Sequence, residues 1–229
     1  MLDIHNLMAD LSQHRPVFHS EADFQFALAW RIHEVMPDCK IRLEFKPYPK
    51  VNMYLDIWIQ TAEIAIELKF PTQNLEANRD NEYFALRAQG AQDTRRYDFL
   101  KDIQRLERVV ADRKAKSGFA ILLTNDPSLW KPPKQGGWKT TNDAKFRIHK
   151  GQIIKGELAW AEQASSGTTK GREGPIRLKG SYHLHWKDYS SLKWRMPFFP
   201  DQSLSDSWEY HPIDYSQFRY LAVSVKPSS

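Results

Sequence analysis

Residues 51–70 read VNMYLDIWIQTAEIAIELKF, and the alternation of apolar and polar residues in this stretch decides the fold. Apolar side chains occupy every second position of residues 51–60, and a second alternation follows in residues 64–70. Strand side chains point to opposite faces with a period of two, and two such runs joined by a short turn form a β-hairpin. We therefore predict two antiparallel strands here, the second ended by Pro71.

Three charged side chains share one face of this predicted hairpin. Glu67 and Lys69 lie two residues apart on the second strand, and Asp56 lies on the polar side of the first strand. A hairpin folded about residues 61–62 pairs residues whose numbers sum to about 123, so Asp56 should lie opposite Glu67. The sequence thus predicts two carboxylates and an ammonium in one cluster.

This cluster has a chemistry that suits a divalent ion. Two neighbouring carboxylates repel each other, and one takes up a proton unless a cation lies between them. Mg²⁺ is bound by carboxylate oxygens and usually keeps waters for chemistry, which makes Asp56 and Glu67 candidate metal ligands. Lys69 can hold a nucleophilic water or offset charge on a phosphate transition state. The alternative is an ordinary solvated pair, because Glu-x-Lys is common on strands.

The helix that precedes the hairpin adds a third carboxylate. Ser20 is a good N-cap, and an apolar stripe at helical spacing continues from Phe24 until Pro37. Glu21 lies within this inward-facing stripe, where a carboxylate is costly unless it meets a cation. Glu21 is therefore a further candidate for the site.

Three more elements complete the predicted order. Residues 41–45 alternate like a short strand, residues 94–116 have the spacing of a long helix, and residues 118–124 are typical of a buried strand. The predicted order is helix, three strands, helix and strand, which is an α/β fold. Further strands are expected at residues 145–148, 176–186 and 218–225.

The motif on the hairpin resembles that of the PD-(D/E)XK nuclease superfamily, also called restriction-endonuclease-like. The resemblance consists of Asp56, ten intervening residues and Glu67-Leu68-Lys69, within the element order of residues 20–125. Leu55 stands where the literal pattern has proline. We therefore expect a restriction-endonuclease-like αβββαβ core with a central mixed sheet, followed by a C-terminal β-rich extension.

The resemblance also implies roles for individual residues. Asp56 and Glu67 would ligate Mg²⁺, for which Mn²⁺ is the expected substitute. Lys69 would position or activate water, and Glu21 would act as an accessory ligand or base. Some members hold a further polar residue on the next helix, for which the candidates are Asp102 and Gln104.

The chain of 229 residues has a net charge of +5, and this charge is unevenly distributed. We expect one domain over residues 1–229, with a nuclease core at about 18–125 and a basic, aromatic-rich extension at about 126–229. Residues 131–195 carry a net charge of +9, which leaves the rest of the chain at −4. Such a segment suits a phosphate polyanion, although a solvated surface explains it equally well. The candidate nucleic-acid-binding residues are Arg105, Arg108, Lys145, Arg147 and Lys150.

Several classes of protein are disfavoured by the composition. The apolar runs are far shorter than the roughly 20 residues that cross a bilayer, and no secretory signal opens the chain. Cys39 is the only cysteine, which excludes a disulfide framework and favours the cytoplasm. His183 and His185 share one predicted strand face without an evident third metal ligand.

The sequence therefore predicts a Mg²⁺-dependent phosphodiesterase acting on nucleic acid, most simply a DNA endonuclease. The alternative is a nucleic-acid-binding or protein-interaction module that keeps the fold without turnover. No membrane partner is expected. A homodimer is plausible, because two-fold symmetry is the simplest way to cut both strands of a duplex with one site per chain. RNA as substrate and exonuclease action stay open as alternatives.

Overall fold

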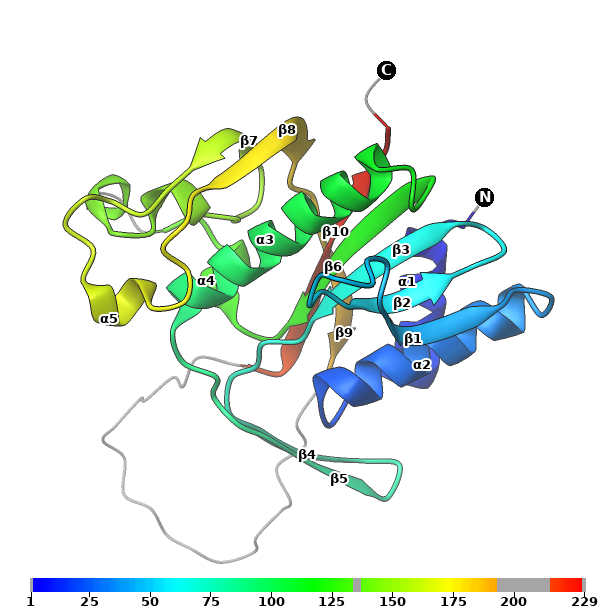
Figure 1. The fold of residues 1–229 in the computed structure, drawn as a ribbon. Coiled ribbons are helices and arrows are strands. Elements are labelled where there is room, and N and C mark those ends of the chain that lie inside the picture. Colours follow the sequence, from blue (N-terminus) through cyan, green and yellow to red (C-terminus); the bar gives the residue numbers. More distant parts are fainter. Residues whose placement is uncertain (1, 134–136, 193–214, 228–229) are drawn as a thin grey trace, which may run out of the picture.

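Residues 55–69 form a hairpin within a mixed sheet in the computed structural model, which describes residues 2–133, 137–192 and 215–227 (Figure 1). The helices are α1 (Ile4–His14), α2 (Glu21–Val35), α3 (Gln92–Ala111), α4 (Pro127–Trp130) and α5 (Ser166–Thr169). The strands are β1 (Ile41–Phe45), β2 (Leu55–Ile59), β3 (Ile64–Lys69), β4 (Leu75–Arg79), β5 (Glu82–Leu86), β6 (Ser117–Thr124), β7 (Ile153–Leu158), β8 (Ile176–His183), β9 (Trp186–Ser191) and β10 (Gln217–Val225).

The central sheet has six strands in the order β1-β2-β3-β6-β10-β9. Strands β1, β2 and β3 are antiparallel neighbours, whereas β6 lies parallel to β3 after the long crossover through α3. Strand β10 returns antiparallel to β6 and pairs with β9 at the far edge. The expected α/β class with a central mixed sheet is therefore confirmed.

Both faces of this sheet are covered (Figure 1). On one face, the side chains of Ile66 and Leu68 join a core with α1 and α2. On the other face, Ala65 and Ala120 join a second core with α3 and the β7–β8 hairpin. Because side chains alternate along β3, the residues in step with Ala65 point toward α3. These are Glu67 and Lys69.

Local signals set the ends of the two helices that matter most. The Ser20 side chain accepts a hydrogen bond from the Asp23 N–H at 3.1 Å, so α2 begins where the N-cap predicts. Helix α3 follows Ala91, which has a positive φ of 62° and makes no side-chain cap. It ends at Ala111, five residues short of the predicted end at residue 116, where the chain turns into β6.

Some predicted strands differ from the structure. Residues 51–54 are not part of β2, because the ladder with β1 ends at the pair Phe45 and Leu55 and leaves them without a partner. Residues 145–148 do not form the predicted strand. Residues 145–146 belong to the 3₁₀ turn Ala144–Phe146 and residues 147–148 follow it, with the side chains of Phe146 and Ile148 buried. Residues 176–186 split between β8 and β9, which belong to different sheets.

Other elements have no counterpart in the prediction, namely α1, the β4–β5 hairpin, β7 and the short helices α4 and α5. None of the helices within the described ranges is both long and apolar enough to cross a membrane. Two parts of the basic segment 131–195 lie outside the described residues, namely 134–136 and 193–195.

Candidate active site

The predicted register of the hairpin is confirmed. Ile57 pairs with Ile66 and Ile59 with Ile64, so paired residue numbers sum to 123. The ladder between β2 and β3 ends at the pair Ile57 and Ile66, and the residue before Ile57 on β2 is Asp56. Its Oδ2 accepts the Leu68 N–H at 2.5 Å. A carboxylate thus replaces the strand partner at the open end of the hairpin.

Asp56 is an acid in an unfavourable electrostatic position. Burial, together with the nearby Asp102 and Glu21 carboxylates, raises its pKa to about 6 against the opposing effects of the Leu68 N–H and Lys69. The ionised form of Asp56 is therefore less favourable here than that of an aspartate in water. A cation at this position would favour the ionised form.

Glu67 is the more deeply buried of the pair, with 1% of its surface exposed. Arg105 Nη2 on α3 lies 3.1 Å from Glu67 Oε1, yet this oxygen receives no hydrogen bond among the described residues. Burial, followed by the Asp102 carboxylate, raises the pKa of Glu67 well above its usual range, and Asp56 adds to the effect. A buried carboxylate oxygen without a hydrogen bond is costly and needs a reason.

Lys69 is held by the third acid of the cluster. Its Nζ lies 2.9 Å from Asp102 Oδ2 and donates to the Leu68 carbonyl at 2.9 Å. Burial alone would lower the pKa of Lys69, but the carboxylates of Asp102 and Glu21 outweigh it and raise the pKa. Lys69 is therefore an ammonium at neutral pH.

Asp102, a candidate from sequence, belongs to the site. Burial raises the pKa of this carboxyl against the lowering effect of Lys69. Arg105, expected to bind nucleic acid, instead reaches into the same cluster. Its Nη1 lies 3.0 Å from Asp102 Oδ1, and its Nη2 also donates to the Tyr54 carbonyl. The helical spacing is readable from the sequence, but only the packing of α3 on the sheet reveals these contacts.

Glu21 also reaches the hairpin. It is the first residue of α2, and its Oε2 accepts the Phe70 N–H at 2.8 Å, just beyond the end of β3. The residue itself is exposed, which corrects the expectation of a fully inward carboxylate. As the first residue of the helix, it can face the sheet end and solvent together.

The remaining candidates lie elsewhere. Gln104 donates to the Arg177 carbonyl on β8, away from the acids. Arg108 lies 4.7 Å over the Tyr48 ring and 3.7 Å from Asp112. Of the three candidates in the extension, Lys145 and Lys150 are exposed. Arg147 forms an ion pair with Asp143 at 3.0 Å.

No group of three or more His, Cys, Asp or Glu side chains within the described ranges is close enough to hold a metal ion as it stands. The rings of His183 and His185 stack 6.3 Å apart. The residues Asp56 and Glu67 still fit a hard ion that keeps several waters, because both have raised pKa values and Glu67 Oε1 lacks a hydrogen bond. In this structure Arg105 supplies the positive charge beside Glu67.

Comparison with protein-family models, curated proteins and solved structures finds no match to this chain. The resemblance to PD-(D/E)XK nucleases thus rests on the residues and geometry described above.

Proposed function

We propose that this chain is a Mg²⁺-dependent nuclease that hydrolyses phosphodiester bonds, with DNA as the favoured substrate and Mn²⁺ as a substitute ion. The observation that carries the proposal is the pair Asp56 and Glu67, two carboxylates with raised pKa values beside the Lys69 ammonium. The element order α2, β1, β2, β3, α3 and β6, with the β4–β5 hairpin inserted between β3 and α3, supports a restriction-endonuclease-like core.

Asp56 and Glu67 would hold the ion, which when bound polarises the phosphate and lowers the pKa of a bound water. Lys69 would offset the negative charge that develops on the phosphate, and Asp102 keeps its ammonium in position at 2.9 Å. Because the pKa of Lys69 is raised, it is a poor general base. Glu21, an exposed carboxylate at the end of β3, is then the candidate for taking the proton of the attacking water.

Nicking of supercoiled plasmid tests this proposal. The wild-type chain should nick plasmid with Mg²⁺ or Mn²⁺ and not with EDTA, and Asp56→Asn should be inactive while keeping the wild-type circular dichroism spectrum. Cleavage by Asp56→Asn at the wild-type rate would show that the site is wrong. Linear product that forms without a nicked precursor would support paired chains, as expected for a homodimer.

A second candidate is a nucleic-acid-binding module without turnover. It is favoured by the contacts of Lys69 with Asp102 and of Arg105 with Glu67, which balance the acids without any added ion. The same plasmid assay separates the two, because a binding module would retard DNA on a gel and leave it intact with every divalent ion tried.

A further inference from the structure

A basic cleft lies beside the candidate site, between α3 and β8. Its volume is about 400 Å³, and Met53 forms part of its floor. Five cationic side chains and two carboxylates line it. The cations are Lys101, Arg105, Arg108, Arg177 and Lys179.

Neither carboxylate of the cleft can neutralise these cations fully. Glu107 is buried, and its oxygens accept the N–H groups of Lys179 and Gly180 and the Tyr182 hydroxyl at 2.7–3.0 Å. Asp112 is exposed and lies 3.7 Å from Arg108. Arg177 is paired with Glu157 at 2.7 Å and Arg105 with Glu67 at 3.1 Å. Among the described residues, the ammonium groups of Lys101 and Lys179 have no ion-pair partner, so the cleft keeps uncompensated positive charge at these two positions.

The walls of the cleft are fixed to each other. The β7–β8 ladder shifts register where Gly156 pairs with Leu178 and Lys155 with Ser181, so Lys179 and Gly180 bulge out of it. Glu107 takes the backbone N–H groups of this bulge. A β-bulge redirects side chains, and here it accompanies a Lys179 side chain that lines the cleft. The charges are thus arranged before any ligand arrives.

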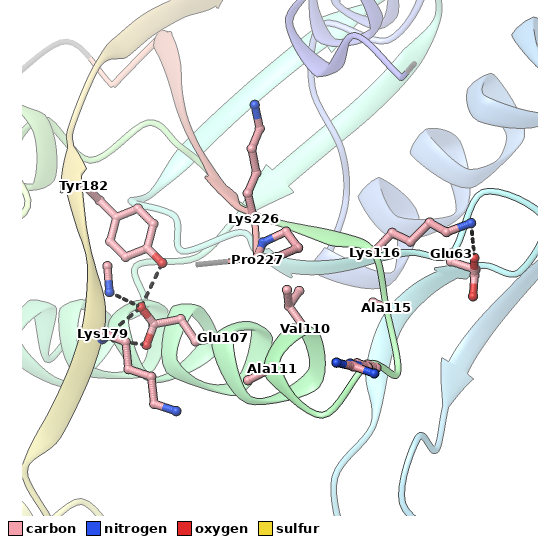
Figure 2. Close-up of a pocket in the computed structure, with 12 residues that line it drawn as sticks. Glu63, Glu107, Val110, Ala111, Ala115, Lys116, Lys179, Tyr182, Lys226 and Pro227 are labelled. Atoms are coloured by element: carbon pink, nitrogen blue, oxygen red, sulfur yellow. Dashed lines mark hydrogen bonds and ion pairs between the residues drawn. The ribbon is translucent and has the colours of Figure 1, made fainter. Parts of the chain in front are cut away.

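The cleft leads to the acids through one side chain. Arg105 lines it and ends 3.1 Å from Glu67 Oε1. At the other end, a cavity of about 560 Å³ shares Glu107, Ala111 and Lys179 with the cleft and adds Arg113 and Lys226 (Figure 2). A cationic track therefore follows α3 away from the candidate site.

We propose that the α3–β8 cleft binds the phosphodiester backbone of the nucleic acid and directs it to Asp56 and Glu67. The proposal rests on the nuclease function proposed above and names where its substrate lies. It keeps phosphate binding on the basic extension but assigns it there to Arg177 and Lys179 of β8 in place of Lys145, Arg147 and Lys150. Cations in a fixed groove beside a reactive site bind phosphates and raise the association rate.

The salt dependence of DNA binding tests this site. Affinity of the full chain for a fluorescent 20-base-pair duplex, and for one of its strands, is measured by anisotropy between 50 and 300 mM KCl with Ca²⁺ present. The test variant carries Lys101→Gln, Arg177→Gln and Lys179→Gln. The matched control carries Lys145→Gln, Lys150→Gln and Lys155→Gln, which removes the same charge from other exposed positions.

Each lost phosphate contact lowers the log–log salt slope by about 0.9 on duplex and about 0.7 on a single strand. We expect the test variant to lose about 2–3 units of slope on duplex and the control less than about 1. Equal slopes in the two variants, or a larger loss in the control, would overturn the cleft.

The outcome separates this proposal from the nuclease function. If the wild-type chain nicks plasmid and both variants keep the wild-type salt slope, the proposed role of the cleft is wrong and the nuclease function stands. A chain that never nicks plasmid but loses slope in the test variant supports the cleft and overturns turnover. A wild-type chain that binds neither probe at 50 mM KCl overturns both.

Discussion

Glu67 on β3 and Glu107 on α3 are both buried glutamates, and their surroundings are opposite. Glu107 receives two backbone N–H groups and a tyrosine hydroxyl, all within hydrogen-bond distance (Figure 2). Glu67 faces two further carboxylates, has a raised pKa and leaves Oε1 without a hydrogen bond. A carboxylate whose hydrogen bonds come from the backbone of a neighbouring strand stabilises the fold. A buried carboxylate with a raised pKa and an unfilled hydrogen-bond position is typical of a functional site.

The same substitution at the two glutamates should give opposite results. Glu67→Gln should lower metal-dependent nicking by about 10³-fold or more and leave the melting temperature unchanged or higher, since it removes an acid from a repelling cluster. Glu107→Gln should retain nicking but lower stability by about 2 kcal/mol, because an amide cannot accept all of its hydrogen bonds. Plasmid nicking and thermal melts measure both. Loss of activity in both variants, with stability unchanged, would erase the distinction.

Lys69 tests whether the cluster performs chemistry. Lys69→Ala should lower the single-turnover cleavage rate by about 10²-fold, because its ammonium offsets charge that grows in the transition state. Affinity for uncut DNA in Ca²⁺ should change little, since one phosphate contact among many is minor. Weak binding with a normal rate at saturating DNA would make Lys69 a phosphate anchor instead.

Arg105 tests whether the cluster needs a cation. Arg105→Gln should lower the free energy of unfolding by about 2 kcal/mol, less than for a fully buried pair because the Arg105 side chain is 27% exposed. Mn²⁺ should then restore more stability to this variant than it adds to the wild-type chain.

The control for Arg105 lies one turn along α3. Arg108→Gln removes a side chain that is 54% exposed and should change stability by less than about 0.5 kcal/mol. If both arginine variants melt alike, with and without Mn²⁺, Arg105 does not act as the counter-ion of Glu67.

Asp56 should give a smaller, pH-dependent effect. Its pKa is raised from 3.8 to about 6, so the folded chain holds this proton more tightly than the unfolded chain. The contribution of Asp56 to stability therefore falls as pH rises from about 4 to about 6 and is constant above that range. A shift of this size corresponds to about 3 kcal/mol, and because Asp56 is partly exposed to solvent, the wild-type chain should lose about 1–2 kcal/mol relative to Asp56→Asn over this range. A difference that is flat or rises with pH would contradict the burial of Asp56.

The central elements of the fold were predictable because each has a local signal. The period of two in residues 51–70 set the hairpin and its register, and Ser20 set the start of α2. The prediction of a strand at residues 145–148 was wrong because two buried side chains two positions apart, Phe146 and Ile148, have the spacing of a strand. Helix α1 was not predicted although its signals are local, because the Asp3 side chain caps it by accepting the His5 and Asn6 N–H groups. Its buried residues also recur at helical spacing, at Ile4, Leu7, Met8 and Leu11. Strand β7 was missed because its pairing with β8, rather than a local pattern, fixes it.

The placement of the candidate acids followed from the same signal, since the register of the hairpin brings Asp56 beside the end of β3, where it accepts the Leu68 N–H. The contacts of Arg105 and the clamp formed by Glu107 were not predictable, because they depend on how α3 lies against β3 and β8. Sequence alone gives a charged helix face but not which charge turns inward.

Direct Mn²⁺ binding tests the central claim that Glu67 and Asp56 form a divalent-ion site. Electron paramagnetic resonance of free Mn²⁺ is titrated with wild-type chain, Glu67→Gln and Glu107→Gln, each confirmed as folded by circular dichroism. We expect one Mn²⁺ bound by the wild-type chain and by Glu107→Gln, and at least tenfold weaker binding by Glu67→Gln. Equal Mn²⁺ affinity in all three chains, or no binding by the wild-type chain, would contradict this claim.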